Sequence, residues 1–238
     1  MVELTLNETP QNPIIIEGSP GFGLVGTIAT EFLLEHLETR LIGNIFMPDL
    51  PAMVAIHNSE VVQPIGIFYN EKFNIIIVHV IANTHGLEWQ LAEDIIELAK
   101  QTNAKQVITL EGVASGAEQT DKSPIMFFAN RQEQIDVLKG RGLEPLKDGI
   151  VMGVTSALML KGKEHDLSAL FALTHSQLPD SKAAAELIKV LDKHLELNID
   201  YEPLLKTAEL FEGKLKSIMT DSQKALGERD KKAMSYVG

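Results

Sequence analysis

Apolar and polar positions along the chain follow two periods, one of two residues and one of three to four. A short β-branched run at residues 14–16 is closed by Glu17 and Gly18, which predicts a buried strand that enters a tight turn. Apolar side chains then recur at steps of three and four over residues 25–37, with polar side chains between them. This spacing predicts an amphipathic helix directly after the turn.

Strand-like runs dominate the next part of the chain. They follow one another with no helix-length connection, at residues 41–46, 53–57, 66–69 and 73–82. Parallel neighbours need a crossover of about a dozen residues or more, whereas antiparallel neighbours need only a turn. We therefore expect these strands to form an antiparallel meander.

Helices and strands alternate again after the meander. The periodicity predicts a helix at residues 87–102, with Trp89 among its inward-facing side chains, and a second helix at 132–139 that is closed by glycines. The other predicted elements are strands at 106–110, 125–129 and 167–174, and a helix that begins at the capping residues 179–181. Helices on both sides of a sheet with an antiparallel patch indicate an α/β fold, a three-layer α/β/α sandwich with a mixed sheet.

The chain changes character near Asp200. Residues 1–202 carry 14 basic and 28 acidic side chains, a net charge of −14, whereas residues 203–238 carry 7 basic and 5 acidic ones, a net charge of +2. We expect residues 1–202 to form the α/β/α domain and residues 203–238 to form a C-terminal helix and tail. Apolar positions of this helix follow alternating steps of four and three, at Leu204, Ala208, Phe211, Leu215 and Ile218. Such a seam either packs onto its own domain or contacts another subunit of an oligomer.

The composition removes several classes of function. The chain has 238 residues, no cysteine and a net charge of −12. The lack of cysteine excludes disulfides, zinc–thiolate sites and cysteine nucleophiles, and the negative charge disfavours nucleic acid and anionic membranes as main partners. The first residues lack the features of a signal peptide, and no apolar run approaches the roughly 18 residues of a spanning helix. We therefore expect a cytoplasmic protein.

A glycine-rich loop lies between the first predicted strand and the first predicted helix, and contains Gly18, Pro20, Gly21, Gly23 and Gly26. Its last three glycines fit the G-x-G-x-x-G spacing that brings backbone close to a pyrophosphate, so one alternative is a phosphate- or nucleotide-binding enzyme. The acidic residue that such a site needs after the next strand is matched only by Asp49 in a proline-bounded turn, and the meander replaces the βαβ unit. This favours a structural loop, whose glycines adopt positive φ and let the helix pack closely on the sheet.

Other residues that could carry chemistry lack the partners that a reaction would need. His79 and His85 belong to no pattern of two histidines and one carboxylate, so we expect each to be satisfied or exposed. Ser115 lacks the two glycines that flank a nucleophile elbow. We predict no catalytic residue, no metal site and no cofactor.

Four segments of the chain form a series: GSPGFGLVG at 18–26, MPDLPA at 47–52, LEPLKDGIVMG at 143–153 and LPDSKAAA at 178–185. In this order, and over about residues 14–210, they resemble the proteasome-assembly-chaperone family in its archaeal and bacterial branch. The resemblance implies an α/β/α domain similar in fold to nucleoside phosphorylases, without an established catalytic site. It also implies homo-oligomers and binding to proteasome core particles through a C-terminal tail.

The C-terminal tail differs from the pattern of that family. The family's tail ends in a hydrophobic residue, a tyrosine and any terminal residue, whereas here Tyr236 is third from last and Val237 follows it. We predict a non-enzymatic homo-oligomer that binds proteasome subunits or the core particle, and neither nucleic acid nor a membrane. Its predicted contact residues are the apolar seam of the C-terminal helix, Tyr236 and Val237.

Overall fold

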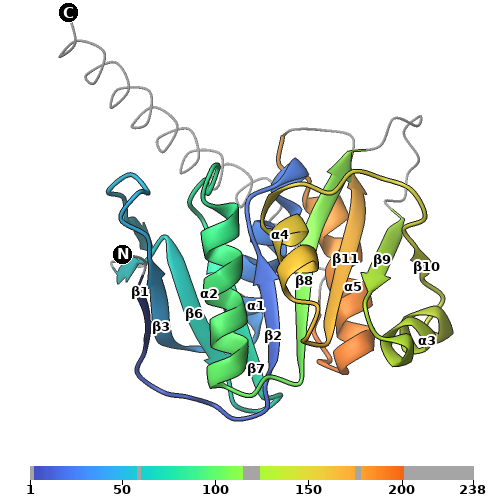
Figure 1. The fold of residues 1–238 in the computed structure, drawn as a ribbon, viewed down its shortest axis with the longest axis horizontal. Coiled ribbons are helices and arrows are strands. Elements are labelled where there is room, and N and C mark those ends of the chain that lie inside the picture. Colours follow the sequence, from blue (N-terminus) through green and yellow to red (C-terminus); the bar gives the residue numbers. More distant parts are fainter. Residues whose placement is uncertain (1–2, 58–59, 115–123, 175–177, 201–238) are drawn as a thin grey trace, which may run out of the picture.

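The computed structural model describes residues 3–57, 60–114, 124–174 and 178–200, which form a layered α/β domain (Figure 1). Within this part of the chain, one mixed sheet has the strand order β1 (Glu3–Leu6), β3 (Arg40–Phe46), β6 (Ile65–Asn70), β7 (Ile75–Val80), β2 (Ile14–Gly18), β8 (Gln106–Ala114), β11 (Leu167–Thr174), β9 (Ile125–Ala129) and β10 (Glu144–Pro145). A separate hairpin pairs β4 (Ala55–His57) with β5 (Glu60–Val62).

The centre of the sheet is parallel, and both flanks contain antiparallel pairs. Strands β7, β2, β8 and β11 are parallel neighbours. The central strands are apolar runs because helices cover both of their faces, and all residues of β7 are buried. On one flank, β1, β3, β6 and β7 are antiparallel neighbours, which confirms the predicted meander for the strands at 41–46, 66–69 and 73–82. The strand predicted at 53–57 is not part of this meander, because β4 pairs with β5 in the separate hairpin.

Helices cover both faces of the sheet. One face carries α1 (Val25–His36), α3 (Gln132–Gly140) and α5 (Ser181–Leu195), and the other carries α2 (Glu88–Gln101) and α4 (Gly153–Lys161) (Figure 1). Phe32 and Ile188 belong to the core on the first face, and Ile95 and Leu158 to the core on the second. The predicted three-layer sandwich with a mixed sheet is therefore confirmed. None of the described helices is both long and apolar enough to cross a bilayer.

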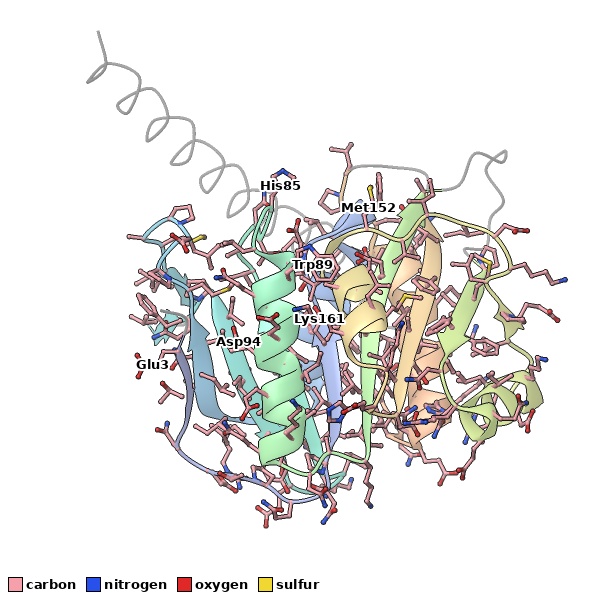
Figure 2. The ribbon with its side chains drawn as sticks, viewed as in Figure 1. Glu3, His85, Trp89, Asp94, Met152 and Lys161 are labelled. Carbon is pink, nitrogen blue, oxygen red and sulfur yellow. The ribbon has the colours of Figure 1, made fainter. Side chains whose placement is uncertain are left out.

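One side chain of α2 does not lie where the periodicity placed it. Trp89 was predicted to face inward but is 51% exposed. It belongs to the first turn of the helix, before the buried residues Leu91 and Ala92, and the Lys161 ammonium lies 5.7 Å from its ring centroid (Figure 2). A cation over the ring face takes the place of a core contact.

The predicted second segment lies outside the described residues. This applies to the boundary near residue 202, to the whole of 203–238, and to the contact residues proposed there: Leu204, Ala208, Phe211, Leu215, Ile218, Tyr236 and Val237. The described chain ends at Asp200, after α5. The roles assigned to residues 203–238 therefore stay predictions.

Candidate functional site

A cavity of about 840 Å³ opens at the carboxyl edge of the parallel strands. Its lining includes residues 20–22 after β2, Asn83 and His85 after β7, residues 111–114 at the end of β8, and residues 148–153, which lead into α4. In open α/β sheets this edge is where ligands usually bind, because loops from several strands converge there. The cavity brings together the glycine loop at 18–26 and the segment at 143–153, which are far apart in the sequence.

The glycine loop at 18–26 brings helix α1 into close contact with the sheet. A Cβ atom on Gly26 would lie 2.3 Å from the carbonyl oxygen of Leu110, and one on Gly18 would lie 2.2 Å from the carbonyl oxygen of Gly26. Gly23 has a φ of +63°, and Leu24 after it has a φ of +50°. Close approach and positive φ are the two backbone properties expected of a structural loop.

Asp180 holds the glycine loop from the side of α5. Its backbone N–H donates to the carbonyl oxygen of Gly23 at 2.8 Å, and its carboxylate accepts from the Thr174 hydroxyl at 2.8 Å. The same carboxylate caps α5 by accepting from the backbone N–H of Ala183 at 3.0 Å. Through Asp180, the segment at 178–185 also reaches the edge of the sheet where the cavity lies.

We expect Asp180→Ala to lower the free energy of unfolding by about 1–2 kcal/mol, because α5 loses its N-cap and Thr174 loses an acceptor. Urea denaturation measures the change. Asp136→Ala, on the exposed part of α3, is the matched control and should stay within about 0.5 kcal/mol of the parent protein. Equal unfolding free energies for the two variants would contradict the capping role of Asp180.

The place that a phosphate would occupy beside the glycine loop holds a carboxyl group. A Cβ atom on Gly21 would lie only 2.0 Å from Oε1 of Glu111, so the Glu111 carboxyl packs directly on the loop backbone. No lysine or arginine is among the described residues that line the cavity. An anionic ligand would meet a second acid here without a compensating cation, so this geometry does not favour phosphate or nucleotide binding.

Glu111 is the end of a buried chain of polar side chains. The chain begins at Ser19 and Glu17, passes through Thr109 of β8 and Thr155 of α4, and returns to β8 at Glu111. The Ser19 hydroxyl donates to the Glu17 carboxylate, and the Thr109 hydroxyl lies 2.6 Å from the other Glu17 oxygen. Thr109 and Thr155 lie 2.7 Å apart by their hydroxyl oxygens, and the Thr155 hydroxyl lies 3.2 Å from Glu111 Oε2. The chain therefore links two buried carboxyl groups through hydroxyl groups.

Burial shifts both acids toward their neutral forms. Glu111 is 7% exposed, and its pKa is raised to about 8, first by burial and then by the neighbouring Glu17. Hydrogen bonds from Thr155 and from the backbone N–H of Gly112 act in the opposite direction. Burial also raises the pKa of Glu17. Near neutral pH, Glu111 is therefore a neutral acid at the inner end of the cavity.

The two histidines near this edge have different surroundings. His79 is buried on β7, where its Nδ1 lies 2.8 Å from the Thr30 hydroxyl and its Nε2 lies 2.9 Å from a Glu31 carboxylate oxygen. His85 is exposed beside the cavity. Each histidine was expected to be either satisfied or exposed, and the surroundings of His79 and His85 agree with this. In the described part of the chain, no three His, Asp or Glu side chains converge in a way that could hold a metal ion.

Large apolar side chains are exposed at the same edge of the sheet. Ile150 is 88% exposed, Met152 is 60% exposed and Leu178 is 58% exposed. Ile150 and Met152 line the cavity, and Figure 2 shows Met152 at the end of the molecule where His85 also lies. Exposed apolar side chains around a cavity are typical of a surface that contacts a partner.

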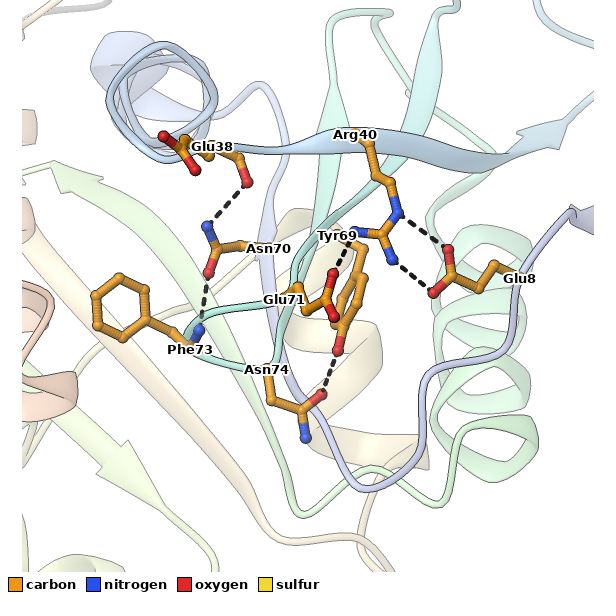
Figure 3. Close-up of polar contacts among 8 residues, drawn as sticks. All are labelled: Glu8, Glu38, Arg40, Tyr69, Asn70, Glu71, Phe73 and Asn74. Atoms are coloured by element: carbon orange, nitrogen blue, oxygen red, sulfur yellow. Dashed lines mark hydrogen bonds and ion pairs between the residues drawn. The ribbon is translucent and has the colours of Figure 1, made fainter.

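A second hollow, of about 770 Å³, is lined by residues 36–40, 70–73 and 197–200. Its polar groups bind one another (Figure 3). The Arg40 guanidinium donates to both oxygens of Glu8, at 2.7 and 3.0 Å, and Asn70 bridges the Glu38 carbonyl and the Phe73 N–H. These contacts fix a turn and the N-terminal segment, and we assign this hollow a structural role.

Comparison with known families decides the identity of the domain. The model of the PAC2 family matches residues 15–219. The chain belongs to the PAC2 family. It is 32% identical to Pyrococcus furiosus PbaA, described as an archaeal homolog of proteasome-assembly chaperone, with 94% of this chain and 99% of PbaA covered and a TM-score of 0.85.

Two further proteins are similar to this chain in sequence or in fold. The Methanocaldococcus jannaschii protein MJ0106 is 30% identical over 230 residues, which cover 95% of this chain and 94% of MJ0106. Pyrococcus furiosus PbaB, described as an archaeal proteasome activator, is 22% identical with a TM-score of 0.74, and covers 91% of this chain and 98% of its own. PbaB therefore shares the fold. The family resemblance expected from the sequence is confirmed.

The sequence prediction for this PAC2 domain found the glycine loop but missed the acid beside it. Pro20 and Gly21 line the cavity, Gly23 contacts Asp180, and Gly18 and Gly26 lie between α1 and the sheet. Ser115 lies outside the described residues. Glu111 was not singled out, although a single acid within a mainly apolar strand signals a buried group with a special environment.

Proposed function

We propose that the protein is a homo-oligomeric proteasome-assembly chaperone homologue that binds proteasome subunits or the core particle. The observation that carries this proposal is the similarity to PbaA, at 32% identity over 94% of this chain. The protein works by binding and catalyses no reaction.

Two features of the chain support this proposal. The edge of the sheet presents Ile150, Met152 and Leu178 to solvent, as a surface that contacts partners would. The segment 203–238 carries an apolar seam and a net charge of +2, opposite in sign to that of residues 1–202. We assign subunit contacts to the seam and partner contacts to Tyr236 and Val237.

The test uses the full chain, purified archaeal proteasome α-subunits and the assembled core particle. We expect an affinity-tagged protein to retain one or both of them, and Tyr236→Ala to reduce retention at least about tenfold, a loss of about 1.4 kcal/mol of binding free energy. Ser235→Ala, one position earlier, is the matched control and should retain the parent protein's binding. Absence of retention by the unaltered chain would contradict the proposed function.

The oligomer is tested separately by light scattering coupled to size exclusion. We expect the molar mass of the parent protein to be that of a homo-oligomer. The molar mass of Phe211→Asp should be lower, because a charge replaces an apolar residue of the seam. Lys214→Asp lies off the seam and introduces the same side chain. A single mass for all three proteins would contradict the role assigned to the seam.

A further inference from the structure

The cavity at the carboxyl edge of the sheet has an acidic inner end and apolar walls. Glu111 forms the inner end, where its carboxyl group packs against the backbone of Gly21 and lies near that of Gly153. The walls include the apolar side chains of Val113, Met126, Leu146 and Leu173. At about 840 Å³ the cavity lies within the range that small-molecule sites occupy.

The hydrogen bonds at this inner end require one proton more than the hydroxyl groups supply. Four contacts join Ser19, Glu17, Thr109, Thr155 and Glu111, and each contact needs one hydrogen. The three hydroxyl groups supply three hydrogens. Either Glu17 or Glu111 must therefore carry a proton. Glu111 is the one of the two that lines the cavity, where a donor from a ligand would favour its ionised form.

The charges around the cavity select the sign of the ligand. Glu17 lies on β2, the strand next to β8, which carries Glu111. Asp148 lines the cavity from the segment before α4. His85 lines it from the loop after β7, and neither α4 nor the glycine loop contributes a lysine or arginine to the lining. The described lining residues include two acids and no lysine or arginine, so a cationic donor that favours ionisation of Glu111 fits this end better than an anion does.

We propose that this cavity binds a primary ammonium group carried on an apolar chain. The ammonium group donates to the Glu111 carboxylate, and the apolar chain lies along the walls toward Ile150 and Met152. The site shares Ile150 and Met152 with the apolar edge that supports the proposed function, but it does not depend on the contacts assigned to residues 203–238. The shared chemistry belongs both to a free alkylamine and to the side chain of a lysine residue.

Binding exchanges one cation for one proton at Glu111. Because the pKa of Glu111 is raised to about 8, the empty site is protonated at pH 7, and a bound ammonium favours the ionised carboxylate. We therefore expect the protein to release about one proton for each amine bound at pH 7.

The test is isothermal titration calorimetry at pH 7 with n-hexylamine hydrochloride and with 1-hexanol, each in two buffers of different ionisation enthalpy. We expect the amine to bind about tenfold to a hundredfold more tightly than the alcohol, because a charge-assisted hydrogen bond is made only by the amine. The dependence of the measured enthalpy on the buffer gives the number of protons released. Equal affinities, no binding of either probe, or no proton release would overturn the proposal.

Two variants locate the binding event. Glu111→Gln replaces the neutral acid by a neutral side chain of the same shape, so it should fold and lose amine binding about tenfold or more. Asp166→Asn is the matched control, because Asp166 is a partly buried acid whose pKa is also raised but lies at the opposite end of β11. Unchanged amine affinity in folded Glu111→Gln would overturn the proposal, and the proton count of the unaltered protein tests it without a variant.

A third probe, Nα-acetyl-lysine methylamide, separates the two sources. If it binds with release of a proton, the site accepts a lysine side chain presented by a polypeptide. If only n-hexylamine binds with release of a proton, the site accepts a free amine. Either result supports the proposed chemistry and names its source.

Discussion

When the pH rises from 5 to 7, the free energy of unfolding of the parent protein is expected to fall by about 2 kcal/mol relative to that of Glu111→Gln. The folded protein holds a proton on Glu111, whose pKa is raised from 4.5 to about 8, whereas the unfolded chain releases that proton near its ordinary pKa. A raised pKa stabilises the folded state fully below the unfolded value, and the stabilisation is lost as the pH rises toward the folded value. The slope approaches about 1.4 kcal/mol per pH unit midway between the two pKa values and is smaller near either of them, so the whole interval gives about 2 kcal/mol.

Urea denaturation of both proteins at pH 5, 6 and 7 measures this difference. Glu133→Gln, which changes an exposed carboxyl of α3, controls for the change in net charge. If the free energies of unfolding of the parent protein and Glu111→Gln run parallel over this range, the buried acid does not hold its proton. The cation exchange proposed for the cavity would then lose its physical basis.

Gly26→Ala is expected to destabilise the protein by about 3 kcal/mol or more. The added Cβ would lie 2.3 Å from the carbonyl oxygen of Leu110, and both atoms belong to rigid elements, α1 and β8. Overpacking in a well-packed core usually costs about 1–3 kcal/mol, and here the neighbour is backbone and has no rotamer to change. Helix α1 would have to move away from the sheet.

The control for this variant is Gly140→Ala at the end of α3. A Cβ there meets nothing within 4 Å, and its φ is not positive, so alanine should be neutral or stabilise the protein by up to about 1 kcal/mol. Thermal and urea denaturation of both variants give the comparison. A Gly26→Ala protein as stable as the parent would show that the approach of α1 to the sheet is looser than described.

The elements that the sequence predicted well are long and have one clear period. The strand predicted at residues 167–174 is β11 with the same bounds, and the helix predicted at 25–37 is α1 to within one residue. Helix α4 was not predicted because its own apolar residues are distributed around the helix and do not form one face. Val154, Ala157 and Leu158 are buried while Leu160 on the same helix is exposed, so the run fits a strand as well as a helix. Strand β10 has only two residues and no period to detect.

Glu111, the acid at the inner end of the cavity, was not predicted as a site residue for a different reason. Glu17 and Glu111 each appear in the sequence as one charge beside an apolar run, and only the pairing of β2 with β8 brings them near each other. That pairing joins distant parts of the chain, and no local pattern reports it. The glycine loop, by contrast, was found because its glycines are consecutive signals in one short segment.

The place of β2 in the sheet has a consequence for the order in which a ribosome delivers the domain. Strand β2 is synthesised early, but its two partners are β7, which begins at Ile75, and β8, which begins at Gln106. The hairpin of β6 and β7 closes over a short loop, so β7 can pair with β6 before β8, the second partner of β2, has been synthesised. We expect β2 to remain without its full ladder until β8 has left the ribosome, so the nascent chain exposes an apolar strand over much of its synthesis.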